Sequence, residues 1–425
     1  MIDSRFVKVL IFLCVILFVR FVLFRKLIRF MLFSFDAAVL LGYVLFFVLP
    51  SAFITDLLPY YHFLITSGYV MYLSGSMITS FVFKKRMCNL RTLTLPASDS
   101  VLSLALLYCL SFVMARFLSF LFSGGPGLIY QTWFTGIPIQ TAVSAAEAVF
   151  FGIERPESAS LTNLVLRFLN YAFLGFFSVV LLRRPVIAFP LWAIYMVTLL
   201  ANYMGRSSLF IYLLLPTISY SMIRNSPALT RKALLFSSLA IFVAFPLLSA
   251  LRTGTVLGNL RDALEDWYLT TSYPIVNAMN LSRTVSGVGW LNYLWHLIIK
   301  PIPFLLWPDK PLVNMNLEGT YMLYGRISSI STFTMLGEGM YYGGQYGFLF
   351  LMVLFGLISK MVELLLMNKN ALFAVPYVYV LCSTLIMIRS TFSDYCSTIL
   401  NILPPLLIIT FGLKFIMHIP STRNK

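Results

Sequence analysis

The chain is poor in charged residues, in histidine and in cysteine. Asp, Glu, Lys and Arg make up 11% of its 425 residues, beside three histidines and five cysteines. Soluble globular domains carry about a quarter charged residues, so this scarcity excludes an ordinary soluble protein. The cysteines are scattered without disulfide or metal-ligand spacing. There is also no glycine-rich phosphate loop and no Asp-x-Asp motif. We therefore expect no metal and no other cofactor.

What the chain has instead is long apolar runs. Its hydrophobic fraction is 60% and its mean hydropathy is +0.88. A run of about 20 apolar residues crosses the hydrocarbon core of a bilayer as a helix. The pattern predicts an all-α, polytopic membrane protein with a single membrane domain and about eleven transmembrane helices. These are expected at 6–24, 36–54, 63–83, 101–122, 161–182, 186–204, 208–223, 233–251, 346–367, 371–388 and 397–416. The first run lacks a small-residue cleavage site, so we interpret it as a retained helix.

The net charge of +16 is placed in a way that indicates a membrane rather than nucleic acid. Most basic residues form short clusters between apolar runs, for example Lys84–Arg86 and Arg183–Arg184. Cytoplasmic loops of membrane proteins carry such clusters. Taking them as cytoplasmic places the N-terminus outside and the C-terminal tail inside. Every predicted cytoplasmic loop is short, which leaves no cytoplasmic domain for a nucleotide.

Two large loops face outward in this topology, 123–160 and 252–345. Within them, 137–152 and 290–307 are apolar, and we expect both to lie in the membrane interface. If 290–307 crossed the membrane, the C-terminal basic residues would lie outside, against the usual bias.

Five arginines lie at the outward ends of different predicted helices. Guanidinium groups match the oxygens of phosphate, and placing one near lipid costs a few kcal/mol, which a bound anion would offset. The alternative is that they reach lipid phosphates or pair with outward acids such as Asp394. The pattern favours a diphosphate site built from Arg116, Arg167, Arg206, Arg252 and Arg389.

Two motifs follow in the long loop. Pro301–Pro311 reads PIPFLLWPDKP, and its prolines favour extended backbone. Leu336–Gly347 reads LGEGMYYGGQYG, in which Glu338 is a candidate general base. The alternative is a carboxylate stabilised by the dipole at a helix N-terminus. Weaker base candidates are Asp309, Glu318 and His296.

These motifs resemble those of the oligosaccharide repeat-unit polymerases, the O-antigen polymerases of the Wzy type. The resemblance includes the Gly-Arg-Ser turn at Arg206 and extends in topology over nearly the whole chain. One departure concerns the first motif, where the family often has a basic residue soon after the first proline pair. Here Phe304–Leu306 occupies that place and Lys310 is the motif's basic residue.

The resemblance implies a GT-C-like membrane glycosyltransferase at the periplasmic face of the bacterial inner membrane. It would move a growing chain from undecaprenyl diphosphate to an incoming lipid-linked repeat unit. Charge stabilisation of the leaving diphosphate would come from the arginines and Lys310. Glu338 would activate the acceptor hydroxyl, and Tyr341 and Tyr342 would contact sugars, unless they form part of an aromatic belt. Expected partners are the undecaprenyl-diphosphate-linked oligosaccharide, membrane lipid and a chain-length regulator.

Three other functions remain open on the sequence. An O-antigen ligase shares the architecture and the lipid donor. A transporter, such as a lipid-linked oligosaccharide flippase, tends to have inverted repeats and charges at the membrane midplane. A membrane acyltransferase would need a histidine base, and none of the three histidines has such a setting.

Overall fold

The computed structural model is mainly helical over the residues that it describes, and it contains no strand there. These residues are 34–48, 50–51, 54, 59–83, 99–124, 161–200, 215–220, 260–284, 289–302, 306–307, 309–311, 315–325, 333–366 and 373–418, with the single residues 14, 127 and 212. The helices expected at 6–24 and 233–251 lie outside these ranges, apart from Cys14, as does the interfacial stretch 137–152. Most of 208–223 also lies outside.

Three of the described helices are long and apolar enough to cross a membrane. They are α5 (Asp99–Phe122), the later part of α15 (Met335–Leu366) and the earlier part of α17 (Phe392–His418). These apolar helices are consistent with the predicted membrane protein, and large apolar side chains on α5 are exposed: Leu107 is 65% and Phe122 88% accessible. Contiguous apolar surface of this kind marks a site of contact with another protein or with membrane lipid.

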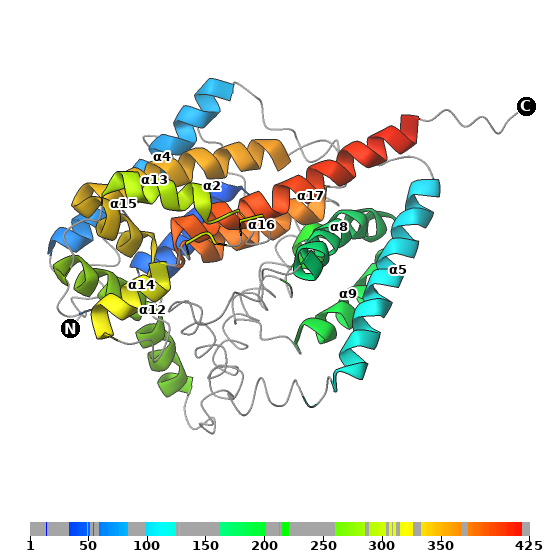
Figure 1. Ribbon diagram of the computed structural model, residues 1–425, viewed down its shortest axis with the longest axis horizontal. Coiled ribbons are helices and arrows are strands. Elements are labelled where there is room, and N and C mark those ends of the chain that lie inside the picture. Colours follow the sequence, from blue (N-terminus) through cyan, green and yellow to red (C-terminus); the bar gives the residue numbers. More distant parts are fainter. Residues whose placement is uncertain are drawn as a thin grey trace, which may run out of the picture.

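Shorter apolar helices complete the bundle. They are α2 (Phe35–Tyr43) with its π-helical continuation η2 (Val44–Val48), α8 (Leu161–Arg183), α9 (Pro185–Leu200) and α16 (Ala374–Met387). Helix α4 (Pro59–Phe83) packs along α15. In Figure 1 α5, α8 and α9 form one group at the right, joined to the rest through contacts of α8 with α16 and α17.

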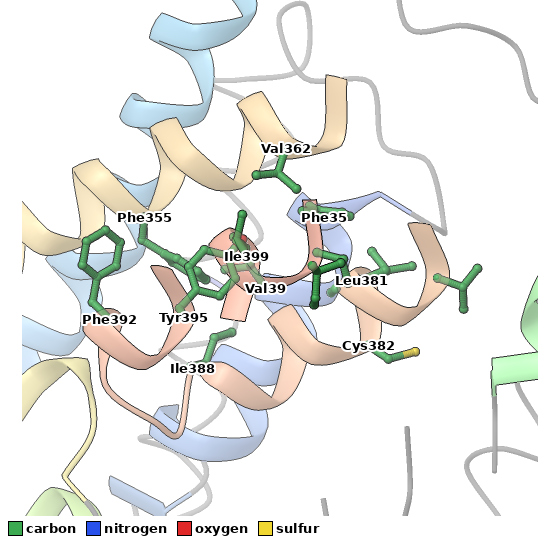
Figure 2. Packing of buried hydrophobic residues seen from close by; sticks show 14 of the residues in the cluster. Phe35, Val39, Phe355, Val362, Leu381, Cys382, Ile388, Phe392, Tyr395 and Ile399 are labelled. Atoms are coloured by element: carbon green, nitrogen blue, oxygen red, sulfur yellow. The ribbon is translucent and has the colours of Figure 1, made fainter. Parts of the chain in front are cut away.

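The core lies where α2, α15, α16 and α17 meet. Phe35 and Val39 of α2 face Phe355 and Val362 of α15, with Tyr395 of α17 beside them (Figure 2). All five side chains are essentially inaccessible. This packing joins segments that are more than 300 residues apart in the chain.

Helices α4 and α15 approach each other closely at two glycines. A Cβ atom on Gly75 would overlap the carbonyl oxygen of Val353, and one on Gly356 would overlap the carbonyl oxygen of Tyr72. Small residues at crossing points allow such backbone contact, which is a common way for helices to associate within membranes.

The predicted 252–345 loop is largely helical where it is described. It contains α12 (Leu260–Thr284), α13 (Trp290–Ile299), α14 (Met315–Tyr324) and the first segment of α15. The ten residues of α13 are too few to span a bilayer, and the position of 290–307 in the membrane interface stays a prediction.

Helix α15 begins at Met335, eleven residues before the predicted start of the ninth span at 346. It breaks at Gly344, whose φ of 61° and ψ of −151° are accessible essentially to glycine alone. A Cβ atom on Gly339 would overlap the backbone of Phe348, so the segment before the break packs against the segment after it. The glycine-rich motif is therefore a sharp helical bend that carries Glu338.

Candidate active site

Glu338 is held at the N-terminus of another helix. Its carboxylate accepts hydrogen bonds from the backbone N–H groups of Phe392 and Ser393, the latter at 3.2 Å, in the first turn of α17. The side chain is 1% exposed. An anion in this place satisfies donors that have no partner within α17 and interacts favourably with its dipole. Glu338 also lies in the first turn of α15. The alternative role considered for it, a carboxylate stabilised by the dipole at a helix N-terminus, therefore describes part of its setting.

The first turn of α17 is organised by its own side chains as well. The Thr391 hydroxyl accepts a hydrogen bond from the Asp394 backbone N–H at 3.3 Å and donates to the Asp394 carboxylate at 2.6 Å. Ser390 donates to the same carboxylate at 2.9 Å. The Thr391 hydroxyl therefore acts as an N-terminal cap of α17 and also fixes the Asp394 side chain. The site is thus built on a fixed helix end.

Lys300, directly after α13, is the cation of this cluster. Its ammonium lies 2.7 Å from Asp394 Oδ1 and donates to the Ser393 hydroxyl at 2.9 Å. The Lys300 side chain is 14% exposed and that of Asp394 is 32% exposed. The ion pair fixes α13 against the N-terminus of α17, where Glu338 is also bound. One cation and two carboxylates therefore meet at one helix end.

The electrostatic setting brings the carboxyl groups of Glu338 and Glu318 into the neutral range. Burial raises the pKa of Glu338 to about 7, against the opposing charge of Lys300 and hydrogen bonds from Ser393 and Phe392. Burial likewise raises the pKa of Glu318, on α14, to about 7, again opposed by Lys300. A carboxyl group that titrates near pH 7 can act as a base or an acid at that pH.

His296 and Tyr342 form a polar pair next to these groups. His296 Nδ1 lies 2.7 Å from the Tyr342 hydroxyl. Burial lowers the pKa of His296, and Lys300 lowers it further. Burial raises the pKa of Tyr342, and the charges of Glu318 and Glu338 add to this effect. The pair therefore favours a neutral imidazole beside a protonated phenol.

The two predicted sugar-contact tyrosines are both buried in this structure. Tyr341 is 4% and Tyr342 2% exposed, and their rings meet edge to face with centroids 4.8 Å apart. Tyr293 of α13 packs against Tyr342 at 4.8 Å between centroids. The aromatic rings fill the space between α13 and the bend of α15, and contact with a sugar stays a prediction.

Lys310 is bound to backbone carbonyl groups. Its ammonium donates to the carbonyl oxygens of Ile299 and Lys300 at 3.3 and 3.2 Å and to that of Ile302. Burial lowers the pKa of Lys310, with a further contribution from Lys300. Lys310 thus caps the C-terminal end of α13 and fixes the backbone that carries Lys300. Asp309, beside it, is exposed.

The five predicted arginines differ in how they lie relative to Glu338, Lys300 and Asp394. Arg389 lies in the connection between α16 and α17, three residues before Phe392, and so close in the chain to the site. Arg116 lies on α5, on the other side of the molecule from α13 and α14 (Figure 1). It donates to the Asn170 side-chain oxygen at 3.1 Å and stands over the Phe112 ring at 5.8 Å. Arg206, Arg252 and the side chain of Arg167 are outside the described part, so convergence of the five stays a prediction.

Lys300 is the functional candidate that sequence reasoning missed. It precedes the proline motif by one residue and had no assigned role, while Asp394 entered only as one acid that could pair with an arginine in the alternative to a diphosphate site. Its place at the end of an amphipathic helix, just before Pro301, was the available signal.

Comparisons of the chain with protein-family models, with curated proteins and with solved structures find no match.

Proposed function

We propose that the chain is a multi-pass glycosyltransferase of the bacterial inner membrane. It would polymerise undecaprenyl-diphosphate-linked repeat units into O-antigen or a related surface polysaccharide, as the motif resemblance implies. In this proposal eleven helices span the membrane and the α13–α14 side of the molecule faces the periplasm. The growing chain moves from its lipid diphosphate to the sugar hydroxyl of the incoming unit.

One observation carries the proposal: a carboxylate that titrates near pH 7, Glu338, is fixed at a helix N-terminus beside Lys300, where a spanning segment begins. The ionised carboxylate would accept the proton of the acceptor hydroxyl as the new glycosidic bond forms. Lys300, Arg389 and the remaining arginines would stabilise the diphosphate that leaves. The apolar face of α13, where Leu291 is 83% and Ile298 61% exposed, would lie among lipid headgroups near the lipid-linked substrate.

A transporter of the same lipid-linked unit is the second candidate, and one observation favours it. Asp36, Lys360 and Glu363 are buried inside the helical bundle. Charged residues within spans are costly and often mark proton or substrate pathways.

The test is genetic complementation of a cell that lacks the chain, with the lipopolysaccharide resolved on a gel. A polymerase is expected to restore a ladder of repeat lengths, and its loss leaves single repeat units on the core. Loss of a ligase or of the transporter leaves no repeat unit there, and a strain lacking the chain with that phenotype would overturn the proposal. Among complementing variants, Lys substitutions of Arg116, Arg167, Arg206, Arg252 and Arg389 are expected to shorten the ladder if guanidinium groups bind the diphosphate.

A further inference from the structure

A second group of charged side chains lies apart from the candidate active site. Asp36 on α2 and Lys360 and Glu363 on α15 form a cluster, named here the buried charge cluster. Lys360 Nζ lies 2.7 Å from Glu363 Oε2 and 3.3 Å from Asp36 Oδ2. Asp36 and Glu363 are 0% and Lys360 is 5% exposed. At about 1.5 Å per residue, the helix carries Lys360 roughly 24 Å beyond the bend at Gly344.

The Asp36 carboxylate is fixed by α4 as well as by Lys360. Its Oδ1 accepts hydrogen bonds from the Ser76 hydroxyl at 2.8 Å and from the Tyr72 hydroxyl at 3.1 Å. Ser76 is one residue from Gly75, where α4 and α15 touch. The close helix crossing therefore positions these donors on the carboxylate.

The Glu363 carboxylate has a matching set of donors. Its Oε1 accepts from the Phe35 backbone N–H at 3.0 Å and from the Tyr377 hydroxyl of α16 at 3.3 Å. A further titratable group, Tyr395 of α17, has its hydroxyl 3.0 Å from the hydroxyl of Ser359, one residue before Lys360. Four helices thus enclose the cluster with hydroxyl and backbone donors, and with no cation other than Lys360 among the described contacts.

The formal charges of the cluster do not cancel. Among the residues that the structure describes, two carboxylates face a single ammonium group, which leaves one negative charge over in the interior of an apolar bundle. An uncompensated charge in such a place is costly, and two carboxyl groups that share a site relieve the cost by binding a proton. Hydrogen bonds to both carboxylates reduce the cost of the ionised form, so neither form is excluded by the geometry.

We propose that the buried charge cluster is a proton-binding site of the membrane bundle. It takes up one proton, shared between the carboxyl groups of Asp36 and Glu363, and releases it to water, while Lys360 is the fixed counter-charge. No other bond forms or breaks. Asp36 is in the first turn of α2 and Glu363 is three residues from the end of α15, so both carboxyl groups lie near helix ends.

The test is pH-difference infrared spectroscopy of the full chain in lipid nanodiscs, because a protonated carboxyl group has a C=O band that a carboxylate lacks. As pH falls, the wild type is expected to gain, beside the bands of Glu338 and Glu318, a band equivalent to one proton. Both Asp36→Asn and Glu363→Gln are expected to lose this band, since each variant leaves one carboxylate for one ammonium. Asp99→Asn, at an exposed position on α5, is the matched control and keeps the band. In Lys360→Met the band persists to higher pH, because the counter-charge is gone.

Two further measurements keep the proposal testable if those variants fold poorly. Tyr72→Phe and Tyr377→Phe each remove one donor to a carboxylate without changing charge, and each is expected to move the band's midpoint to higher pH. The proposal is overturned if the band is the same in all variants. It is also overturned if replacing choline by sodium moves the midpoint, because a metal cation would then compete for the site. None of these readouts depends on glycosyl transfer.

Discussion

The carboxylate of Glu338 and the backbone N–H of Ser393 are 3.2 Å apart, although 55 positions separate the two residues in the chain. This hydrogen bond, with its neighbour from Phe392, places a buried acid of α15 on the first turn of α17. Lys300 reaches the same turn from α13. The site therefore depends on three helices meeting at one point, and each can be tested separately.

Replacing Glu338 by Gln tests the base. The amide retains one oxygen acceptor but presents an NH₂ group toward backbone donors, so we expect a loss of about 1–3 kcal/mol in stability. Loss of a general base adds a fall of roughly 100-fold or more in polymerisation rate. Thr391→Ala is the control, because it removes the other cap of α17 at a cost of about 1 kcal/mol. If Glu338→Gln and Thr391→Ala have equal thermal stability and lose the same amount of polymerisation rate, the role of Glu338 is structural.

The pH dependence of activity follows from the raised pKa of Glu338, about 7. A base acts only when ionised, so the initial rate is expected to rise with pH and to level off above 7. Because the folded-state pKa exceeds the ordinary value of 4.5, stability from this group is fully present below 4.5 and is lost as pH rises through 7. Glu318 also titrates near 7, and its Gln variant decides between the two. An inflection that disappears in Glu318→Gln would assign the base to Glu318.

Lys300→Met tests the cation of the site. Lys300 holds down the pKa of both Glu338 and Glu318, so its removal is expected to move the rate inflection to higher pH. It also leaves Asp394 without its ion pair, at a cost of about 1–3 kcal/mol because the pair is only partly buried. Lys300→Arg keeps the charge and is expected to keep the inflection near its wild-type position. A Met variant with an unchanged pH profile would place Lys300 outside the chemistry.

The sequence predicted the apolar helices well because a single property, hydrophobic length, decides them. The expected spans 101–122 and 161–182 correspond to α5 and α8 within two residues at each end. The start of α15 was placed eleven residues late because five glycines between 337 and 347 disfavour a helix locally. Contacts made only in the folded chain, such as Gly339 on Phe348, stabilise the bend.

The sequence predicted that Glu338 belongs to the candidate site, but it did not predict most of the residues that Glu338 contacts there. Glu338 stands out because a carboxylate among glycines at the start of a span is unusual. Its partners lie in the first turn of α17 and cannot be read from spacing, and neither can the pairing of Lys300 with Asp394. Lys310, chosen for its charge, donates from its ammonium group to three carbonyl groups at the C-terminal end of α13, where helix carbonyls lack the donors of a following turn.

The helix crossing of α4 and α15 is tested by Gly356→Ala. The added methyl would overlap the carbonyl oxygen of Tyr72, so we expect a loss of about 1–3 kcal/mol from overpacking. Gly175→Ala on α8 is the matched control, because its Cβ would meet only a Leu406 methyl at 4.0 Å. There the gain in helix propensity, up to about 1 kcal/mol, remains. Thermal unfolding in detergent is expected to shift in opposite directions, and equal shifts would contradict the close crossing.

The bend of α15 is tested by Gly344→Ala beside Gly343→Ala. At Gly344 a Cβ atom would meet nothing within 4 Å, so the cost comes from the backbone alone, about 1–3 kcal/mol for a residue forced into this conformation. At Gly343 the Cβ would overlap the ring of Trp290, and Trp290→Ala is expected to relieve that clash. The Gly344 variant should not respond to Trp290→Ala, because its strain is local. The measurement is a double-mutant cycle of thermal stability for each glycine variant with Trp290→Ala. We expect coupling between Gly343→Ala and Trp290→Ala, and additive effects for Gly344→Ala and Trp290→Ala. Coupling of equal size at both positions would show that the bend is set by packing, and Glu338 would then owe its position to Trp290 rather than to the glycine.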